Sequence, residues 1–341
     1  MALQVIADDA DAFLKSEVAA GRFRGAVLLA REDEVLLRSG YGLANEEWQL
    51  PNTPTTKFRI GSLTKTFTAA AILRLAEVGA IELGATIGTW LEDLPAAWQS
   101  FTVHQLLTHT AGLRDHVAVP AKRTLNRTGA RPADLIDLIA REPLLFPPGT
   151  NRSYSNTGYI LLGMLIEKVS SRPYAVYLEE KILRPLELTA TGYDSHLQIL
   201  PERASGYALQ GGQLQNADFL DMSVPFSAGG LVSTIDDLLR WNTALHGDGL
   251  LSRSSYERMT AEYPETQKED GFYGYGLFIA KMSGYKCFAH SGGVNGFIAV
   301  LQYYPELRGS LIVLSNLLNP LTMRPVIQRL SGLLLDQSRP T

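Results

Sequence analysis

The sequence predicts an α/β (α+β) protein, in which an antiparallel β-sheet flanked by N- and C-terminal helices carries an inserted all-helical subdomain. Three observations predict this fold class. Strand-like runs occur near both ends of the chain, residues from about 85 to 200 contain short helical segments broken by Pro and Gly, and helical segments occupy both termini. We expect one domain over residues 1–341, with about 1–80 and 201–341 as the sheet part and about 81–200 as the helical part. Such a fold has a natural cleft where the two parts meet.

The N-terminal part is expected to form a helix, a hairpin and a second helix. Residues 3–20 predict a helix that ends at Gly21. The segment "GAVLLAREDEVLLRSGYG" then predicts two strands joined by a polar turn at Glu32–Glu34. A helix over Thr64–Val78 follows, and Gly79 suits the position just after its end.

The rest of the chain is helical first and then rich in strands. Short helices are expected in "TVHQLLTHTAGL", "RPADLIDLIAR", "TGYILLGMLIEKVS" and "PYAVYLEEKILRPL". "GYALQGGQLQ" predicts a hairpin, and "STIDDLLRWNTALHG" predicts a helix that opens with a capping residue at Ser233 or Thr234. The remaining elements are strands at 274–280, 284–289, 296–304 and 309–315 and a last helix over about 322–336.

The composition excludes several classes of function. With 45% hydrophobic and 19% charged residues, the 341-residue chain can bury a large core. A net charge of −4 and scattered Lys and Arg provide no basic surface for nucleic acid or for an anionic membrane, and no window approaches the roughly 18 apolar residues of a membrane span. The single cysteine, Cys287, excludes an internal disulfide and is expected to be a small buried residue. The N-terminal segment lacks the features of a secretion signal, so we expect a cytoplasmic protein, although a chain trimmed of its signal would look the same.

One candidate site lies in "RIGSLTKTFTAAAILR", residues 59–74. Ser62 stands at the expected helix start, and Lys65 lies three residues on, about 5–6 Å away on the same face. In one interpretation Ser62 caps the helix and Lys65 is a surface charge. In the other the two are a chemical pair, because a neutral lysine can take the proton from a serine nucleophile, and apolar surroundings lower the lysine pKa.

Two further segments admit a structural and a functional interpretation. In "FPPGTNRSYSNTGYILLG", Ser155 or Asn156 caps a helix, or Tyr154 and Asn156 present a phenol and an amide beside the lysine. In "AHSGGVNGFIAV", residues 289–300 form a glycine-rich hairpin turn, or a strand edge that lays backbone N–H groups along a cleft. The N–H of Gly293 would then complement that of Ser62 around an oxyanion.

Taken together, "SLTK" (62–65), "YSN" (154–156) and "HSGG" (290–293) resemble the serine β-lactamase and DD-peptidase superfamily. The similarity is greatest to the branch with a Tyr-x-Asn second motif, which includes class C β-lactamases, DD-peptidases and related esterases. "HQLLTHTAGL" and "AGGLVSTIDDLLRW" also look familial, and the resemblance covers roughly residues 20 to 320. It implies a β-lactamase/transpeptidase-like fold.

The resemblance also implies roles for individual residues. Ser62 would be the nucleophile, and Lys65 and Tyr154 would share the general acid and base work. Asn156 would orient the substrate, and the N–H groups of Ser62 and Gly293 would form the oxyanion hole.

The third motif departs from the usual pattern of the superfamily. His290 occupies the place usually held by lysine, and Ser291 and Gly292 match the two substrate-binding residues after it. An unperturbed histidine is mostly neutral at pH 7, so strong capture of an anionic β-lactam or peptide C-terminus is in doubt and neutral esters become more plausible.

The sequence therefore predicts a serine hydrolase that forms an acyl-enzyme, acts as a carboxylesterase on short-chain acyl esters and needs no cofactor. The expected partner is a small-molecule ester, amide or lactam; the oligomeric state cannot be read. A β-lactamase, a D-amino-acid peptidase and a non-catalytic scaffold of the same fold stay open as alternatives. A metal site is not expected, because His104, His109 and His116 lack the spacing of a one-face pair. The loops at 114–132 and 214–227 should form the rim of the cleft.

Overall fold

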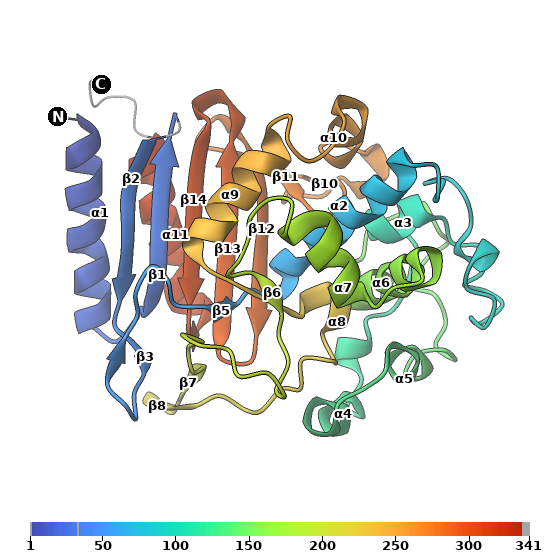
Figure 1. Ribbon diagram of the computed structural model, residues 1–341, viewed down its shortest axis with the longest axis horizontal. Coiled ribbons are helices and arrows are strands. Elements are labelled where there is room, and N and C mark those ends of the chain that lie inside the picture. The colour runs from blue at the N-terminus through green and yellow to red at the C-terminus, as the bar shows by residue number, and fades with distance from the viewer. Residues whose placement is uncertain (1, 33, 336–341) are drawn as a thin grey trace.

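A seven-stranded antiparallel sheet forms the centre of the computed structural model, which describes residues 2–32 and 34–335 (Figure 1). Its strand order is β10-β11-β12-β13-β14-β1-β2, so strands from both ends of the chain meet where β14 pairs with β1. The strands of this sheet are β1 (Gly25–Arg31), β2 (Glu34–Tyr41), β10 (Phe272–Tyr273), β11 (Phe278–Met282), β12 (Tyr285–Val294), β13 (Phe297–Tyr304) and β14 (Gly309–Ser315). The predicted fold class is confirmed.

Helices cover both faces of the sheet. One face packs against the terminal helices α1 (Ala2–Ala19) and α11 (Pro320–Leu335), and the other against α9 (Ile235–His246) and α2 (Thr64–Glu77) (Figure 1). Side chains of a strand alternate between faces, so Val27 and Leu29 join the first core while Ala26 and Leu28 join the second. Burial on both faces explains why β1 is an unbroken apolar run rather than an alternating one.

The helical part lies beside the β10 end of the sheet (Figure 1). Its helices are α3 (Val103–Leu107), α4 (Lys122–Thr128), α5 (Pro132–Asp137), α6 (Asn156–Ser170) and α7 (Tyr174–Leu178). The short helix α8 (Phe226–Gly229) packs against α2 and α6. The expected division of the chain near residues 80 and 200 stays a prediction.

The remaining strands form three small sheets. They are β3 (Leu43–Asn45), β4 (Leu50–Pro51), β5 (Phe58–Arg59), β6 (Gly192–Tyr193), β7 (Tyr207–Gln210), β8 (Gln213–Asn216), β9 (Leu231–Ser233) and β15 (Leu317–Leu318). The expected hairpin around Gly211–Gly212 is confirmed, since β7 and β8 pair antiparallel across it. The capping residue of α9 is Thr234, whose side chain accepts from the Asp237 N–H.

Some expectations differ from the structure or lie outside it. The strand predicted at 284–289 runs on to Val294, and the strand predicted at 274–280 is instead two, β10 and β11. Residue 33 of the predicted hairpin turn and residue 336 of the predicted last helix lie outside the described residues. Over the described part of the chain, no helix has the length and apolar character needed to cross a membrane.

Candidate active site

Ser62 lies in a 3-10 turn, Gly61–Leu63, that leads directly into α2. The N-cap position of α2 is Leu63, and no side chain caps the helix there. The Ser62 hydroxyl is therefore not used for capping, and the structure removes the first of the two interpretations of this residue. Gly61 has φ +51°, a left-handed conformation that glycine adopts without strain.

The strand β12 packs with its backbone against this turn. A Cβ on Gly292 would lie 2.0 Å from the Ile60 carbonyl oxygen and 2.8 Å from the Ser62 nitrogen. A Cβ on Gly61 would in turn lie 2.8 Å from the Gly293 nitrogen. Glycine at these positions thus allows the two backbones to approach closely. The backbone nitrogens of Ser62 and Gly293 both lie at this contact.

Lys65 is fully buried in the first turn of α2 and lies beside Ser62. Its Nζ is 3.0 Å from Ser62 Oγ, 2.8 Å from Asn156 Oδ1 and 2.8 Å from the Ala228 carbonyl oxygen. These three acceptors match the three hydrogens of an ammonium group. Burial lowers the pKa of Lys65 to about 7, against an opposing contribution from the Asp115 carboxylate. Near neutral pH the group therefore exchanges between ammonium and amine, and the amine has a lone pair for the Ser62 proton.

Tyr154 lies beside both Lys65 and Ser62. The Lys65 Nζ stands over the Tyr154 ring, 4.9 Å from its centroid. Burial raises the pKa of Tyr154, while the Ser62 hydroxyl beside the phenol partly offsets this effect. Desolvation is the larger effect, so Tyr154 is a neutral phenol at pH 7.

Asn156, the first residue of α6, joins the lysine to the loop at 114–132. Its Oδ1 accepts from Lys65, and its Nδ2 donates to Asp115 Oδ2 at 2.7 Å. The amide is thereby fixed in orientation at both ends. Asp115 was not among the predicted residues, because one carboxylate in a mixed loop cannot be told from other surface acids without knowing what it contacts.

His290 and Ser291 do not line the pocket that opens onto Ser62, and their expected substrate-binding roles stay predictions. The His290 ring is buried, with Nε2 3.0 Å from the Tyr273 hydroxyl and Nδ1 2.7 Å from the Ser291 carbonyl oxygen. A carbonyl only accepts, so Nδ1 carries the hydrogen and Nε2 accepts from Tyr273. Burial lowers the pKa of His290 to about 3, and the ring is neutral. The Ser291 side chain points to the opposite face of β12, toward α11, because neighbouring residues of a strand alternate.

His109 holds the segment that carries Tyr154. The Ser153 N–H donates to the His109 carbonyl oxygen at 3.0 Å, and the Ser155 N–H donates to His109 Nδ1 at 3.2 Å. The imidazole also lies against the Tyr154 ring, with 4.3 Å between centroids. Burial holds its pKa well below the usual value, so Nδ1 stays an acceptor. The sequence does not reveal which residues His109 contacts.

A pocket of about 350 Å³ opens onto Ser62. Asn156 and Gly293 contribute to its wall, as expected, whereas Gly292 serves the packing of β12 and does not line it. Both expected rim loops take part. The other lining residues are His116, Val117, Lys122, Leu220, Val224, Pro225, Ala228, Gly229, Val294, Asn295 and Leu318.

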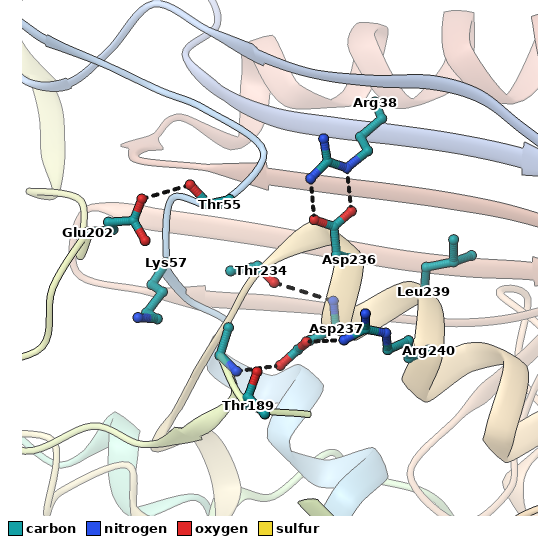
Figure 2. A pocket seen from close by; sticks show the side chains of 11 residues that line it. Arg38, Thr55, Lys57, Thr189, Glu202, Thr234, Asp236, Asp237, Leu239 and Arg240 are labelled. Atoms are coloured by element: carbon teal, nitrogen blue, oxygen red, sulfur yellow. Dashed lines mark hydrogen bonds and ion pairs between the residues drawn. The ribbon is translucent and has the colours of Figure 1, made fainter. Parts of the chain in front are cut away.

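A second, more polar depression of about 570 Å³ lies near the start of α9 (Figure 2). Its charged side chains are already engaged with one another. Arg38 forms a two-point ion pair with Asp236, and Arg240 lies 3.6 Å from Asp237 (Figure 2). The Lys57 ammonium donates to the Pro201 backbone carbonyl. Its Thr55 hydroxyl donates to the Glu202 carboxylate (Figure 2). Ser62 with its buried lysine lies at the other pocket, which we therefore take as the candidate active site.

The fold, together with the segments that carry Ser62, Tyr154 and Gly293, defines a member of the serine β-lactamase and DD-peptidase superfamily. The sequence model of the beta-lactamase family matches residues 10–335. The chain therefore belongs to the beta-lactamase family. Relatives with this fold are hydrolases.

Named relatives and solved structures agree with this membership. The chain is 30% identical over 311 residues to penicillin-binding protein 4* of Bacillus subtilis, an alignment that covers 86% of this chain and 68% of that protein. A penicillin-binding protein from Bacillus halodurans superposes with a TM-score of 0.81 at 26% identity, covering 93% of this chain and 98% of that one. A D-stereospecific amidohydrolase from Streptomyces superposes with a TM-score of 0.76 at 28% identity, covering 92% and 94%.

Proposed function

We propose that this protein is a serine hydrolase that works through a covalent acyl-enzyme, with Ser62 as nucleophile and Lys65 and Tyr154 as proton carriers. The observation that carries the proposal is the buried Lys65, 3.0 Å from Ser62 Oγ, with its pKa lowered to about 7. A lysine with a lowered pKa next to a serine hydroxyl that caps no helix is typical of a catalytic pair and not of a stabilising ion pair.

In the proposed cycle, the amine of Lys65 takes the Ser62 proton, with the Tyr154 phenol beside both groups as a relay. Ser62 Oγ then bonds to the substrate carbonyl carbon, and the N–H groups of Ser62 and Gly293 bind the oxyanion. The bond to the leaving group breaks, and the leaving group takes the proton that Lys65 or Tyr154 holds. Water next attacks the acyl-enzyme and gives a proton to the same pair, which releases the acid and restores the Ser62 hydroxyl.

We favour a carboxylesterase acting on small acyl esters. The support is the state of His290, which is buried, neutral and bonded at both nitrogens, so the third motif brings no cation to the pocket. Much of the pocket wall is apolar, including Leu220, Val224 and Leu318, which suits a short acyl chain.

Hydrolysis of a β-lactam or of a D-amino-acid amide or peptide is the second candidate. It is supported by the relatives, which include a penicillin-binding protein and a D-stereospecific amidohydrolase. The same acyl-enzyme cycle would serve these substrates with an amine as leaving group.

A hydrolysis panel separates the candidates. We expect turnover of p-nitrophenyl acetate and butyrate above that of nitrocefin and of a D-Ala-D-Ala peptide, and we expect Ser62→Ala to abolish it with a nearly unchanged melting temperature. Fast peptide or nitrocefin turnover with no ester turnover would overturn the esterase proposal. Full activity of Ser62→Ala would overturn the mechanism.

A further inference from the structure

The pocket around Ser62 holds a cationic side chain that comes from the helical part and not from the third motif. Lys122 begins α4 and lines the pocket, and it is the one lysine or arginine among the described residues that do so. Part of the pocket wall is apolar, and includes Val117 and Leu318. Lys65 is not an equivalent charge, because its hydrogens are directed to Ser62, Asn156 and Ala228.

The Lys122 ammonium is not neutralised by the protein. Within residues 2–32 and 34–335, it makes no hydrogen bond and no ion pair. The carboxylate that influences it, Asp115, has its oxygens engaged by the Asn156 side chain and the Val117 N–H. Burial lowers the pKa of Lys122, which shows that the ammonium has lost part of its hydration.

A half-buried ammonium that donates no hydrogen bond to a described protein group attracts an anion. A carboxylate is an anionic group that small acyl compounds commonly carry. We propose that Lys122 binds a carboxylate of the substrate, so that preferred substrates are acyl compounds with an anionic group remote from the scissile carbonyl. This inference rests on the proposed function and names the substrate class of the same pocket.

The inference and the esterase proposal are compatible. His290 supplies no charge next to the strand β12, where the scissile carbonyl would be held, whereas Lys122 lines the same pocket from α4 in the helical part. A substrate that fills the pocket would place its scissile carbonyl at Ser62 and its charged end at α4.

Matched esters test the inference. Mono-p-nitrophenyl glutarate is compared with p-nitrophenyl valerate for a charge on the acyl part, and 4-acetoxybenzoate with phenyl acetate for a charge on the leaving group. We expect Lys122→Met to lower the charged-to-neutral ratio of kcat/KM at least tenfold for one pair, and Lys122→Arg to retain most of it. Arg123→Met, which removes the same charge from the exposed neighbouring residue, is the control and should leave the ratio unchanged.

A binding measurement keeps the test independent of turnover. Glutaramic acid and butyramide are titrated calorimetrically into the wild-type protein and into Lys122→Met. The inference predicts tighter binding of the carboxylate compound by the wild-type protein and loss of that preference in the variant. Equal binding of both compounds, or a ratio that Lys122→Met does not change, would overturn the inference and leave the hydrolase proposal intact. Absence of any ester turnover alongside a Lys122-dependent carboxylate preference would overturn the esterase proposal instead.

Discussion

At the scale of the residue, the proposed reaction depends on how many protons Lys65 carries. Its pKa is lowered to about 7 by burial, and only the amine can accept the Ser62 proton. We therefore expect kcat/KM for p-nitrophenyl butyrate to rise with pH as one proton is lost, with its midpoint near pH 7. A pH profile from about pH 5 to about pH 9 measures this directly.

Arginine at position 65 is the matched control for the pH profile. It keeps the positive charge but stays protonated at all accessible pH values, so we expect Lys65→Arg to lose about 10³-fold in kcat. A wild-type profile that is flat across neutral pH, or an active arginine variant, would rule out Lys65 as the base.

His109 provides a second prediction for a single residue. Because it accepts from the Ser155 N–H and lies against Tyr154, His109→Ala should let the phenol move and lower kcat about tenfold, with little change in KM. His109→Asn should recover most of this loss, since Asn Oδ1 can replace Nδ1 as acceptor and asparagine tolerates the φ of +60° found there. Equal activity of the alanine and asparagine variants would show that the contact with Ser155 does not position Tyr154.

Individual site residues differ in how far the sequence reveals them. Ser62, Lys65, Tyr154 and Asn156 lie in local motifs, and the structure brings them together. The surroundings of His290 could not be predicted from the sequence, because they are set by Tyr273 on β10 and by the side to which β12 turns the ring. Asp115 and Lys122 lie at the site because their loop packs against distant segments of the chain. The mixed composition of that loop does not predict this packing.

At the scale of the element, the site depends on how closely β12 approaches the Ser62 turn. A methyl group on Gly292 would overlap the Ile60 carbonyl oxygen at 2.0 Å, so the strand or the turn must move. We expect Gly292→Ala to lower kcat/KM at least tenfold and to destabilise the fold by about 1–3 kcal/mol, since an overpacked contact between backbones cannot relax by rotating a side chain.

Gly293→Ala is the control for stability in this experiment. A Cβ at that position would meet no atom within 4 Å, so the melting temperature of Gly293→Ala should stay close to that of the wild-type protein. Thermal unfolding followed by circular dichroism compares the two variants. Equal melting temperatures for both would show that the close approach at Gly292 is not a constraint on the fold.

The extent of β12 shows a limit of local sequence patterns. The "SGGVNG" segment indicated that a turn begins after residue 289, yet the strand continues to Val294, because β13 pairs with it from Phe297 onward. Gly292 allows the close approach to the Ser62 turn, while the hairpin turn itself lies at Asn295 and Gly296, where Gly296 has φ +83°. The strand and turn propensities of the local residues give no information on that distant contact.

At the scale of the whole molecule, neutral histidines that are buried or partly buried make stability depend on pH. Burial lowers the pKa of His116 to about 4 and those of His246 and His290 to about 3. The unfolded chain binds protons at these groups below about pH 6.5, while the folded protein does not until much lower pH. Their contribution to stability is thus fully present above about pH 6.5, and we expect the free energy of unfolding to fall by about 1.4 kcal/mol per histidine for each pH unit below it. Urea unfolding at several pH values measures the slope.

His246→Phe tests whether histidines cause this slope. The residue lies far from Ser62 in sequence and stacks on Tyr303 at 4.1 Å, so phenylalanine can keep the ring contact while removing the titrating group. We expect the free energy of unfolding of the variant to change less steeply with pH, by the amount that corresponds to about one proton taken up on unfolding. An unchanged slope would assign the acid sensitivity to carboxylates instead.

The architecture was more accessible from the sequence than the site. Apolar strands at both chain ends indicate one sheet to which both ends contribute, and β1 pairs with β14 where they meet. Helices must cover each apolar face of such a sheet, and the sequence shows helical segments available for this. The small strands β5, β6 and β9 were not predicted, since each is two or three residues long and is held by pairing rather than by its own composition.

The central proposal is that Lys65 makes the Ser62 oxygen a nucleophile at neutral pH. Reaction of the folded protein with a fluorophosphonate, followed by peptide mass spectrometry, measures this most directly. One adduct per chain on Ser62, absent in Lys65→Met and after denaturation, is the result that we expect. No adduct, or an adduct on a different serine, would contradict the proposal.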